Sequence, residues 1–358
     1  MKMWKQRMGF LLFAPFLFAG CQKQSPFLKF QAEFYDLFDT VSVITGYAET
    51  ESEFNRYAQI IYDRLKELNR LYDIYHDYPG IQNVKTINDN AGAQPVPVPQ
   101  EIADLLRESI DYYESSGHTV NIALGPVLRL WHDYRTAGIS DPATAAAPPM
   151  SDLARANQNT HIENVLIDLS AQTVFLRDKG MSLDVGAVAK GYAVKLAVAD
   201  AVRAGMTSAI INIGGNVQSV GKPLGGARDQ WGVGIQDPSK PAQGSENILD
   251  TIYINDMSVV TSGNYQRFYE VDGKIYSHII DPERLMPAER YSAVTVAHPD
   301  AGVADMLSTA LYILPLGDGQ VLSKKYGAEA LWIMQDGSLE ATEGYKAMSK
   351  YFGYRPAA

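Results

Sequence analysis

The chain has 358 residues, 46% of them hydrophobic and 20% charged, so it can form one large core or two smaller ones. Its formal net charge is -10, which argues against nucleic acid as a partner, because phosphate binding needs clustered Lys and Arg. The single cysteine, Cys21, excludes an intramolecular disulfide and any CxxC metal or redox pair.

The N-terminus has the composition of a secretory leader. A basic start, MKMWKQR, precedes an apolar run that is too short to span a membrane comfortably, and the small pair AG stands directly before Cys21. This ending resembles a bacterial lipobox, so we expect a signal peptide over residues 1–20 and a lipidated Cys21 with its tether over residues 21–33. The alternative is an ordinary signal peptide that leaves a free thiol. In either case the domain expected over residues 34–350 lies outside the cytoplasm.

Hydrophobic periodicity then predicts the elements of this domain in chain order. Helices are expected at 53–75, 100–115, 188–204 and 302–313, and a surface excursion without regular structure at 136–152. Strands are expected at 35–47, 164–169, 173–176, 208–213, 231–235, 250–254, 258–261, 268–271 and 274–280. The turn Val271-Asp272-Gly273-Lys274 favours a hairpin, so the later sheet is at least partly antiparallel and the fold class is α+β.

The stretch LDVGAVAKGYAVKLA, from Leu183 to Ala197, predicts a strand that delivers Asp184 to the start of a helix. The small residues Gly186 and Ala187 would open the helix, with Lys190 in its first turn. Such a helix start lets backbone N–H groups approach an anion. Asp184 is equally well explained as the N-cap of this helix.

The stretch VADMLSTAL places Asp305 and Thr309 four residues apart on an otherwise apolar helix, so both project from one side. A carboxylate and a hydroxyl on a buried face need a partner, and a hard cation such as Mg²⁺, which takes oxygen ligands, is one. The alternative is a Thr bonded to its own backbone and an Asp paired with Lys or Arg.

The stretch GKIYSHIIDP puts His278 and Asp281 among isoleucines near a strand end. A histidine is suited to proton transfer near neutral pH, although a lone histidine is more often structural. The sequence has no GxSxG motif and no HExxH, so a hydrolase triad and that zinc site are disfavoured. The turn in INIGGNVQSVG lacks GxGxxG spacing and does not support a Rossmann site.

Taken together, these stretches resemble the ApbE family of FAD:protein FMN transferases. Six blocks occur in family order: FDT, NIALGPVLRLW, LDVGAVAKGYA, INIGGNV, VVTSGNYQRFYEVDGKIYSHIIDP and AHPDAGVADMLSTAL. The resemblance implies a T-fold-like arrangement of mixed, largely antiparallel sheets packed with helices, with an FAD site between the two halves. It also implies Mg²⁺-dependent transfer of the FMN moiety of FAD to a Thr or Ser hydroxyl of an acceptor protein, with release of AMP. The family's usual acceptors are flavoprotein subunits of respiratory redox complexes.

By position in these blocks, the resemblance also implies a role for each site residue. His278 corresponds to the family's general base, and the metal ligands are the side chains of Asp305 and Thr309 with the carbonyl of Ala187. The residues implied to contact FAD are Phe38, Tyr75, Thr119, Val120, Asn121, Asp184, Lys190 and Ile280.

The sequence departs from the family pattern at a few positions. Asn121 and Asn216 stand where Asp is common, Phe38 stands for Met, and Glu283-Arg284-Leu285 replaces the usual RTG. Two other functions stay open at this point: an Mg²⁺-dependent FAD pyrophosphatase that uses water as acceptor, and a flavin-binding lipoprotein without catalysis. The intact Asp305, Thr309 and His278 argue against the second of these.

Overall fold

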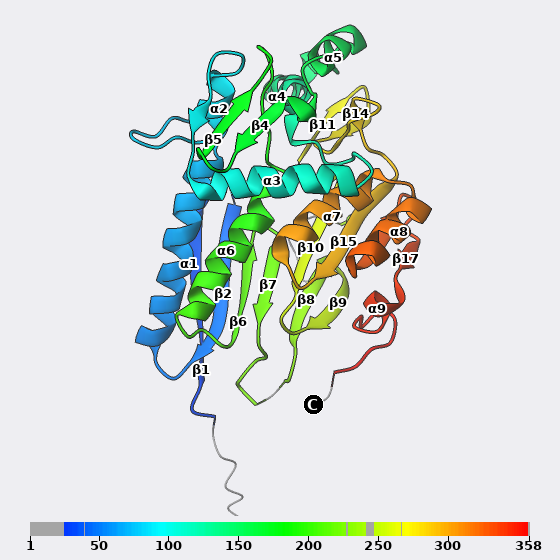
Figure 1. Ribbon diagram of the computed structural model, residues 1–358. Helices are drawn as coiled ribbons and strands as arrows, with labels where there is room; N and C mark the ends of the chain where they lie inside the picture. Colours follow the sequence, from blue (N-terminus) through cyan, green and yellow to red (C-terminus); the bar gives the residue numbers. More distant parts are fainter. Residues whose placement is uncertain (1–24, 39, 227, 241–246, 266, 357–358) are drawn as a thin grey trace, which may run out of the picture.

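The centre of the molecule is an antiparallel sheet of eight strands in the order β1-β2-β6-β7-β10-β15-β16-β17 (Figure 1). The computed structural model describes residues 25–38, 40–226, 228–240, 247–265 and 267–356. The strands of this sheet are β1 Leu28–Leu37, β2 Thr40–Ala48, β6 Ala209–Ile213, β7 Asn216–Val220, β10 Ser258–Gly263, β15 Tyr291–His298, β16 Glu329–Met334 and β17 Leu339–Ala341. All neighbouring strands in it run antiparallel, which confirms the predicted α+β class.

Helices cover one face of this sheet and a hairpin covers part of the other. The covering helices are α1 Glu51–Tyr72, α6 Ala189–Arg203, α7 Ala301–Ile313 and α8 Leu316–Tyr326. Ile61 and Leu65 of α1 and Leu307 of α7 are fully buried in this layer, and each such side chain contributes about 1.5–3 kcal/mol. On the other face a second apolar cluster lies beneath β8 Trp231–Gln236, β9 Ile248–Ile254 and α9 Glu343–Lys346.

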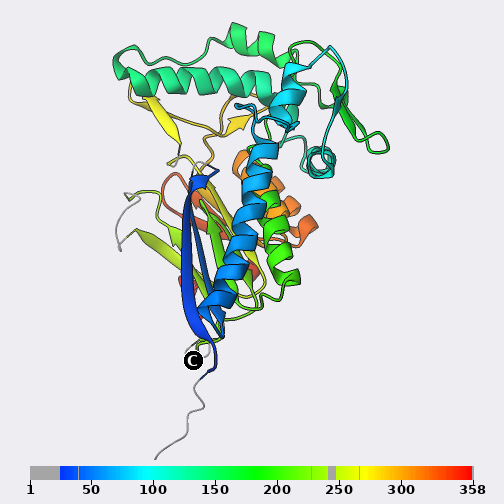
Figure 2. The same ribbon diagram turned by 90° about the vertical axis from the view of Figure 1, so that its left-hand side faces the viewer.

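A lobe of shorter elements lies over the upper end of the sheet (Figures 1 and 2). Its helices are α2 Val84–Asp89, α3 Gln100–Ser115, α4 Gly125–Ser140 and α5 Met150–Asn157, with 3₁₀ turns η1 Ile122–Leu124, η2 Pro142–Thr144 and η3 Ile162–Asn164. Its strands are β3 Val96–Pro97, β4 Val165–Asp168, β5 Thr173–Leu176, β11 Phe268–Val271, β12 Lys274–Ser277, β13 Ile280–Asp281 and β14 Met286–Pro287. A separate apolar cluster around Trp131 and Tyr269 joins α4 to β11.

Most predicted elements are present. The helix at 100–115 and the strands at 173–176 and 268–271 have the predicted bounds, and α1, α6 and α7 differ from theirs by a few residues. Gly205, which directly follows the C-cap of α6, has a φ of 106°, a conformation that glycine adopts without strain.

Two predictions near the N-terminal half were wrong. The single strand at 35–47 is two strands, because the chain reverses between Leu37 and Thr40, with Phe38 in the left-handed region at a φ of 53°. The irregular excursion at 136–152 contains the end of α4, the turn η2 and the start of α5. Two of its three prolines stand at the start of new elements and do not mark a continuous loop: Pro142 begins η2, and Pro149 directly precedes α5.

Two predictions next to the candidate site were also wrong. The segment directly before Asp184 is not a strand. The helix α6 begins only at Ala189, after a turn, so Asp184 is not its N-cap. The strand expected at 274–280 ends at Ser277, which leaves His278 between β12 and β13. The predicted leader and Cys21 lie outside the described residues.

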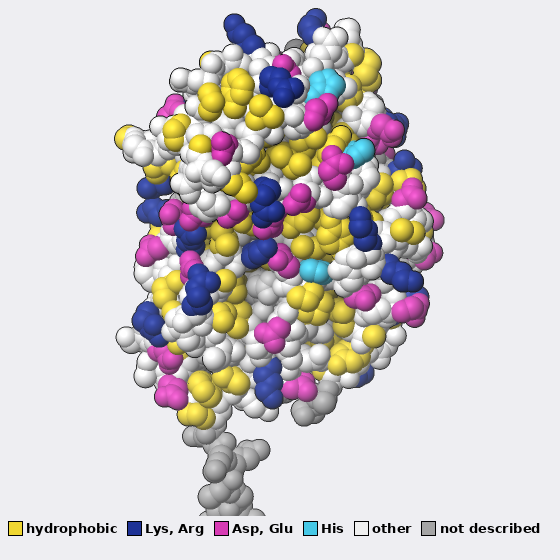
Figure 3. Space-filling model, viewed as in Figure 1, with side chains coloured by type: hydrophobic (Ala, Val, Ile, Leu, Met, Phe, Trp, Pro, Cys, Tyr) yellow, Lys and Arg dark blue, Asp and Glu magenta, His cyan; other side chains and the backbone are white. Residues whose placement is uncertain are grey.

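None of the described helices is both long enough and apolar enough to cross a membrane. On the face seen in Figure 3, acidic and basic side chains are interspersed across the whole surface.

We expect Gly191→Ala to destabilise the fold, because α6 and α7 touch at this glycine. A Cβ added at Gly191 would lie 2.3 Å from the carbonyl oxygen of Ala301 and 2.4 Å from Cβ of Asp305. Neither atom can move without shifting α7, so the free energy of unfolding should fall by about 1–3 kcal/mol, measured by chemical denaturation.

Gly317→Ala in α8 is the matched control, because a Cβ there would meet nothing within 4 Å. This control should leave stability unchanged or raise it by up to about 1 kcal/mol, since Ala is the better helix former. Equal stability of Gly191→Ala and wild type would contradict the close contact between the two helices.

Candidate active site

A cleft of about 570 Å³ lies between the lobe and the upper end of the large sheet. This volume falls within the about 300–1,000 Å³ that is typical of small-molecule and cofactor sites. Its walls come from segments far apart in the sequence: the turn after α1, one face of α4, the turn before α6, the start of β7, the end of β10, the segment after β12, and α7.

All the side chains predicted as site residues line this one cleft. They are Phe38, Tyr75, Thr119, Val120, Asn121, Asp184, Ala187, Lys190, His278, Ile280, Asp305 and Thr309. The fold therefore brings together residues from each of the sequence blocks that carry the predicted site. Their individual roles stay predictions.

One corner of the cleft is built around Asp305, which is only 7% exposed. The backbone N–H of Gly191 donates a hydrogen bond of 2.7 Å to Oδ2 of Asp305, so the first turn of α6 is tied directly to α7. Burial raises the pKa of Asp305 to about 6, although Lys190, this hydrogen bond and the Asn216 amide all favour the charged form. Thr309 lies one helical turn further along α7 and also lines the cleft.

The donor atoms in this corner fit a hard cation. A buried carboxylate, a hydroxyl and the backbone of Ala187 offer oxygen atoms, which are the ligands that Mg²⁺ prefers. Asn216 adds a buried Oδ1 atom that has no hydrogen-bond partner within the described residues. Nowhere in the described part of the chain do three or more His, Cys, Asp or Glu side chains form a metal cluster. The protein would therefore supply only part of the coordination shell of a cation in this corner, and oxygen atoms of a bound ligand or of water would complete it.

His278 lies on the lobe side of the cleft, directly after β12. Its Nδ1 is 3.2 Å from the carbonyl oxygen of Arg267, and its backbone N–H donates to the same oxygen at 3.1 Å. A carbonyl oxygen can only accept, so in the neutral ring Nδ1 carries the proton and Nε2 is left as a base.

The electrostatic surroundings keep this histidine neutral. Burial, together with the positive charges of Arg267, Arg135 and Lys190, lowers the pKa of His278 to about 4. Lys190 also acts on Asp305, so its charge influences both the carboxylate corner and the histidine. At neutral pH His278 is ready to accept a proton without first losing one.

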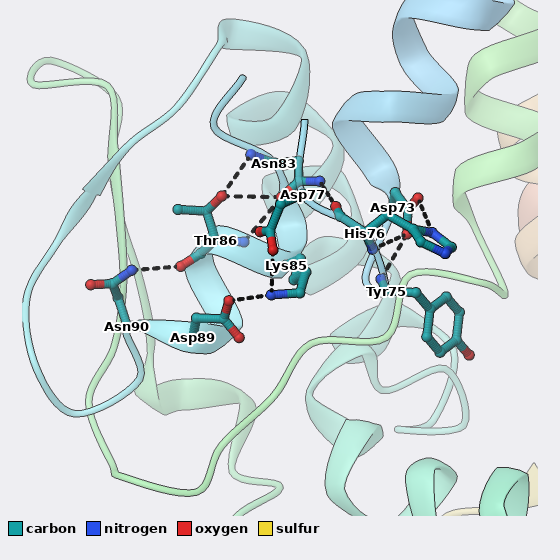
Figure 4. A network of polar contacts seen from close by, with 9 residues as sticks. All are labelled: Asp73, Tyr75, His76, Asp77, Asn83, Lys85, Thr86, Asp89 and Asn90. Atoms are coloured by element: carbon teal, nitrogen blue, oxygen red, sulfur yellow. Dashed lines mark hydrogen bonds and ion pairs between the residues drawn. The ribbon is translucent and has the colours of Figure 1, made fainter. Parts of the chain in front are cut away.

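Asp73 fixes the turn that carries Tyr75 to the mouth of the cleft (Figure 4). Its Oδ1 accepts hydrogen bonds from the backbone N–H groups of Tyr75 at 2.6 Å and His76 at 3.1 Å. Its Oδ2 accepts one from the hydroxyl of Tyr78 at 2.7 Å. The Tyr75 ring is 56% exposed and lies 5.5 Å, centroid to centroid, from the ring of His132. Tyr75 is therefore held in place by its backbone and presents its ring to solvent.

The start of α2 supports the same turn from the other side (Figure 4). Asn83 and Thr86 form a capping box at the N-terminus of α2. The side chain of Asn83 donates to the carbonyl oxygen of His76 at 2.9 Å, and the backbone N–H of Lys85 donates to the carbonyl oxygen of Asp73 at 3.0 Å.

Some predicted contact residues use their side chains to shape the cleft wall. Asn121 accepts a hydrogen bond from the backbone N–H of Ala123 at 2.8 Å and donates to the carbonyl oxygen of Thr160 at 2.9 Å. Asp184 accepts one from the N–H of Gly186 at 2.9 Å, which folds the turn before α6. Both residues still line the cleft, so their exposed atoms remain available to a ligand.

Sequence reasoning missed several residues of the cleft: Asp73, His132, Arg135, Asn216 and Arg267. Leu128, His132 and Arg135 recur at helical spacing on α4, a pattern that was available in the sequence had this helix been predicted. Asp73 directly follows α1, and no sequence pattern indicated that it would cap a turn in the site.

Comparison with known proteins agrees with this arrangement. A family model described as the ApbE family matches residues 38–332. The chain is 33% identical over 268 residues to the FAD:protein FMN transferase of Treponema pallidum, with 72% of each chain covered. It is 30% identical over 303 residues to an FAD:protein FMN transferase of Klebsiella pneumoniae, covering 81% of this chain and 84% of that relative.

The fold is similar to solved structures as well. An ApbE protein from Thermotoga maritima superposes with a TM-score of 0.77 at 26% identity, over 90% of this chain and 99% of that one. The apo form of the Pseudomonas stutzeri flavinyl transferase ApbE gives a TM-score of 0.72 at 22% identity, over 93% and 98% of the two chains, a likeness of fold alone. Because the family model spans most of its length and these curated relatives share 30% or more of their aligned residues, the chain belongs to the ApbE family.

Proposed function

We propose that this protein transfers the FMN moiety of FAD to a Ser or Thr hydroxyl of an acceptor protein and releases AMP. The observation that carries the proposal is a neutral histidine base, His278, in the same cleft as a buried carboxylate and a lysine. The curated relatives named FAD:protein FMN transferase support the same reaction.

In this reaction His278 acts at the acceptor hydroxyl. Its Nε2 takes the hydroxyl proton as the oxygen forms a bond to the phosphorus of the FMN half of FAD. The bond between that phosphorus and the bridging oxygen breaks, and AMP leaves with the electron pair. His278 returns its proton to solvent after the products separate. Lys190, whose charge acts on both His278 and Asp305, faces the negative charge that develops on the leaving phosphate.

We also assign a Mg²⁺ site to Asp305, Thr309 and the carbonyl of Ala187. When bound, the cation would neutralise charge on the pyrophosphate, the main contribution of metals to phosphoryl transfer. The remaining cleft residues would hold FAD, and the exposed Tyr75 ring offers a surface for stacking on an aromatic ring of FAD.

The leader supports a location in the bacterial cell envelope. We propose that Cys21 carries a lipid anchor and that the domain acts on the extracytoplasmic side of the membrane. A flavoprotein subunit of a membrane-bound respiratory redox complex would then be within its reach as acceptor.

The function is tested by incubating the protein with FAD, Mg²⁺ and a flavin-acceptor domain and following covalent flavin fluorescence on the acceptor. Covalent transfer with matching release of AMP is the expected result. AMP release without transfer would instead support the FAD pyrophosphatase, and FAD binding without AMP release would support a binding protein.

We expect His278→Ala to lower the transfer rate by about 10²–10⁴-fold, because general base catalysis contributes this much. FAD affinity, measured by equilibrium dialysis, should change little, since the proton acceptor is not needed for binding. His161→Ala, which removes an exposed histidine that does not line the cleft, is the control for nonspecific damage and should retain most of the rate. Transfer by His278→Ala at the wild-type rate would exclude the histidine as the base.

The pKa of His278 predicts an unusual pH dependence. The imidazole of a free histidine has a pKa near 6.5, whereas the pKa of His278 is about 4. The unprotonated form of His278, which can accept a proton, should therefore predominate at every pH above about 4. Its imidazole resonances in NMR should thus show no protonation between pH 8 and 5.5 in the protein without FAD. Arg267→Gln removes one of the charges that lower this pKa and should raise the midpoint. A wild-type midpoint near 6.5 would contradict the assigned environment.

Cys21→Ser tests the anchor. The wild-type protein should fractionate with membranes and incorporate radiolabelled palmitate, and the variant should do neither, because Cys21 is the only cysteine. Ser25→Ala, which keeps the cysteine, is the control. Membrane association that persists in Cys21→Ser would rule out a lipid on this residue.

A further inference from the structure

The β11–β12 hairpin projects from the cleft at the candidate base. Arg267 directly precedes β11 and His278 directly follows β12, and both hydrogen bonds from His278 to the Arg267 carbonyl close the base of the hairpin. Asp272 and Gly273 form its tip, with φ values of 51° and 78°, as a tight hairpin turn requires. Any movement of the hairpin would therefore change the position of His278.

The two faces of the hairpin differ. Directly opposite residues point to the same side, so Tyr269 and Tyr276 share one face. That face packs on the lobe: the rings of Tyr276 and Trp131 are stacked 5.7 Å apart, and Tyr269 is 4% exposed. The two tyrosines of this face therefore belong to the core of the lobe.

The opposite face carries two large apolar side chains in solvent. Phe268 is 41% exposed and Ile275 is 49% exposed. Phe268 pairs with Ser277, and Ile275 pairs with Glu270. The two pairs are two residues apart along each strand, so the side chains of Phe268 and Ile275 point to the same side of the hairpin. Neither side chain lines the cleft, so a ligand held entirely within the cleft leaves both exposed.

We propose that this face, Phe268 and Ile275 of the β11–β12 hairpin, is the docking surface for the acceptor protein. The inference rests on the proposed function, which requires a polypeptide hydroxyl to reach His278. Neighbouring strands lie about 4.8 Å apart, and a strand rises about 3.3 Å per residue. The backbone of Phe268 is therefore about 5–8 Å from the backbone of His278, and that of Ile275, three residues before His278, is about 10 Å from it. Those are the distances that an extended acceptor segment covers within three residues of its modified hydroxyl.

The chemistry of the face defines what fits it. Phe268 and Ile275 are diagonal neighbours on this face, which also carries the exposed Glu270 opposite Ile275. The two apolar side chains favour an acceptor segment that presents an apolar residue about three positions from the modified Ser or Thr. Arg267 at the base of the hairpin is exposed and makes no ion pair within the described residues, so the face ends in a positive charge beside the reacting group. The lysine near the tip, Lys274, is instead paired with Glu289 at 2.9 Å.

The test compares the double variant Phe268→Ser/Ile275→Ser with wild type, using the full protein, FAD, Mg²⁺ and a flavin-acceptor domain. We expect the KM for the acceptor domain to rise about ten- to thirtyfold, because truncating buried apolar anchors has this effect on protein interfaces. FAD affinity should stay within about twofold of wild type, which also shows that the variant is folded.

Two controls define the outcome. Val321→Ser changes an apolar side chain on α8 that is 71% exposed and does not line the cleft, and it should leave the acceptor KM unchanged. Phe268→Leu/Ile275→Leu keeps the face apolar and should restore most of the affinity. An unchanged acceptor KM in the serine double variant would overturn the docking surface while leaving the proposed function intact. Failure of the wild-type protein to modify any acceptor would overturn the proposed function and the docking surface together.

Discussion

The site depends on one close contact between two helices. The N–H of Gly191 in α6 reaches Asp305 in α7 only because residue 191 has no side chain, since a Cβ there would overlap the backbone of α7. This contact places Lys190 beside a buried carboxylate and sets the turn with Ala187 over the same corner. A buried charge is costly unless it has a counter-charge or a metal, so the contact defines a position that a cation stabilises.

Three basic side chains of the cleft, Arg135, Lys190 and Arg267, all act on His278. Arg135 and Arg267 make no ion pairs within the described residues, and together with Lys190 they lower the pKa of His278. Such like-charged groups repel one another, and indeed the neighbouring Arg267 contributes to lowering the pKa of Arg135. A pyrophosphate would relieve this repulsion. Binding of the substrate would thus strengthen the base, because each added negative charge near His278 raises its pKa.

The sequence predicted the elements and the chemistry better than the connections between them. Helices and strands with strong periodicity, such as α3 and β5, were predicted with correct bounds. The strand break at Phe38 depends on a left-handed backbone conformation that no glycine signalled. The roles of Asp73 and Arg135 depend on tertiary packing, which brings the turn after α1 next to a face of α4 in one cleft. Periodicity along one segment holds no information on such a pairing.

The two halves of the molecule divide the reaction between them. The carboxylate corner lies on α6 and α7, whose apolar faces are built into the main core, so its geometry is rigid. The proposed base, His278, directly follows β12 of a hairpin that packs on the small apolar cluster around Trp131 and Tyr269. A small cluster resists displacement less than a large one, so the lobe can adjust to a macromolecular acceptor while the corner proposed to bind the pyrophosphate stays fixed. This division suits an enzyme that must bind one constant small substrate and one large partner in the same cleft.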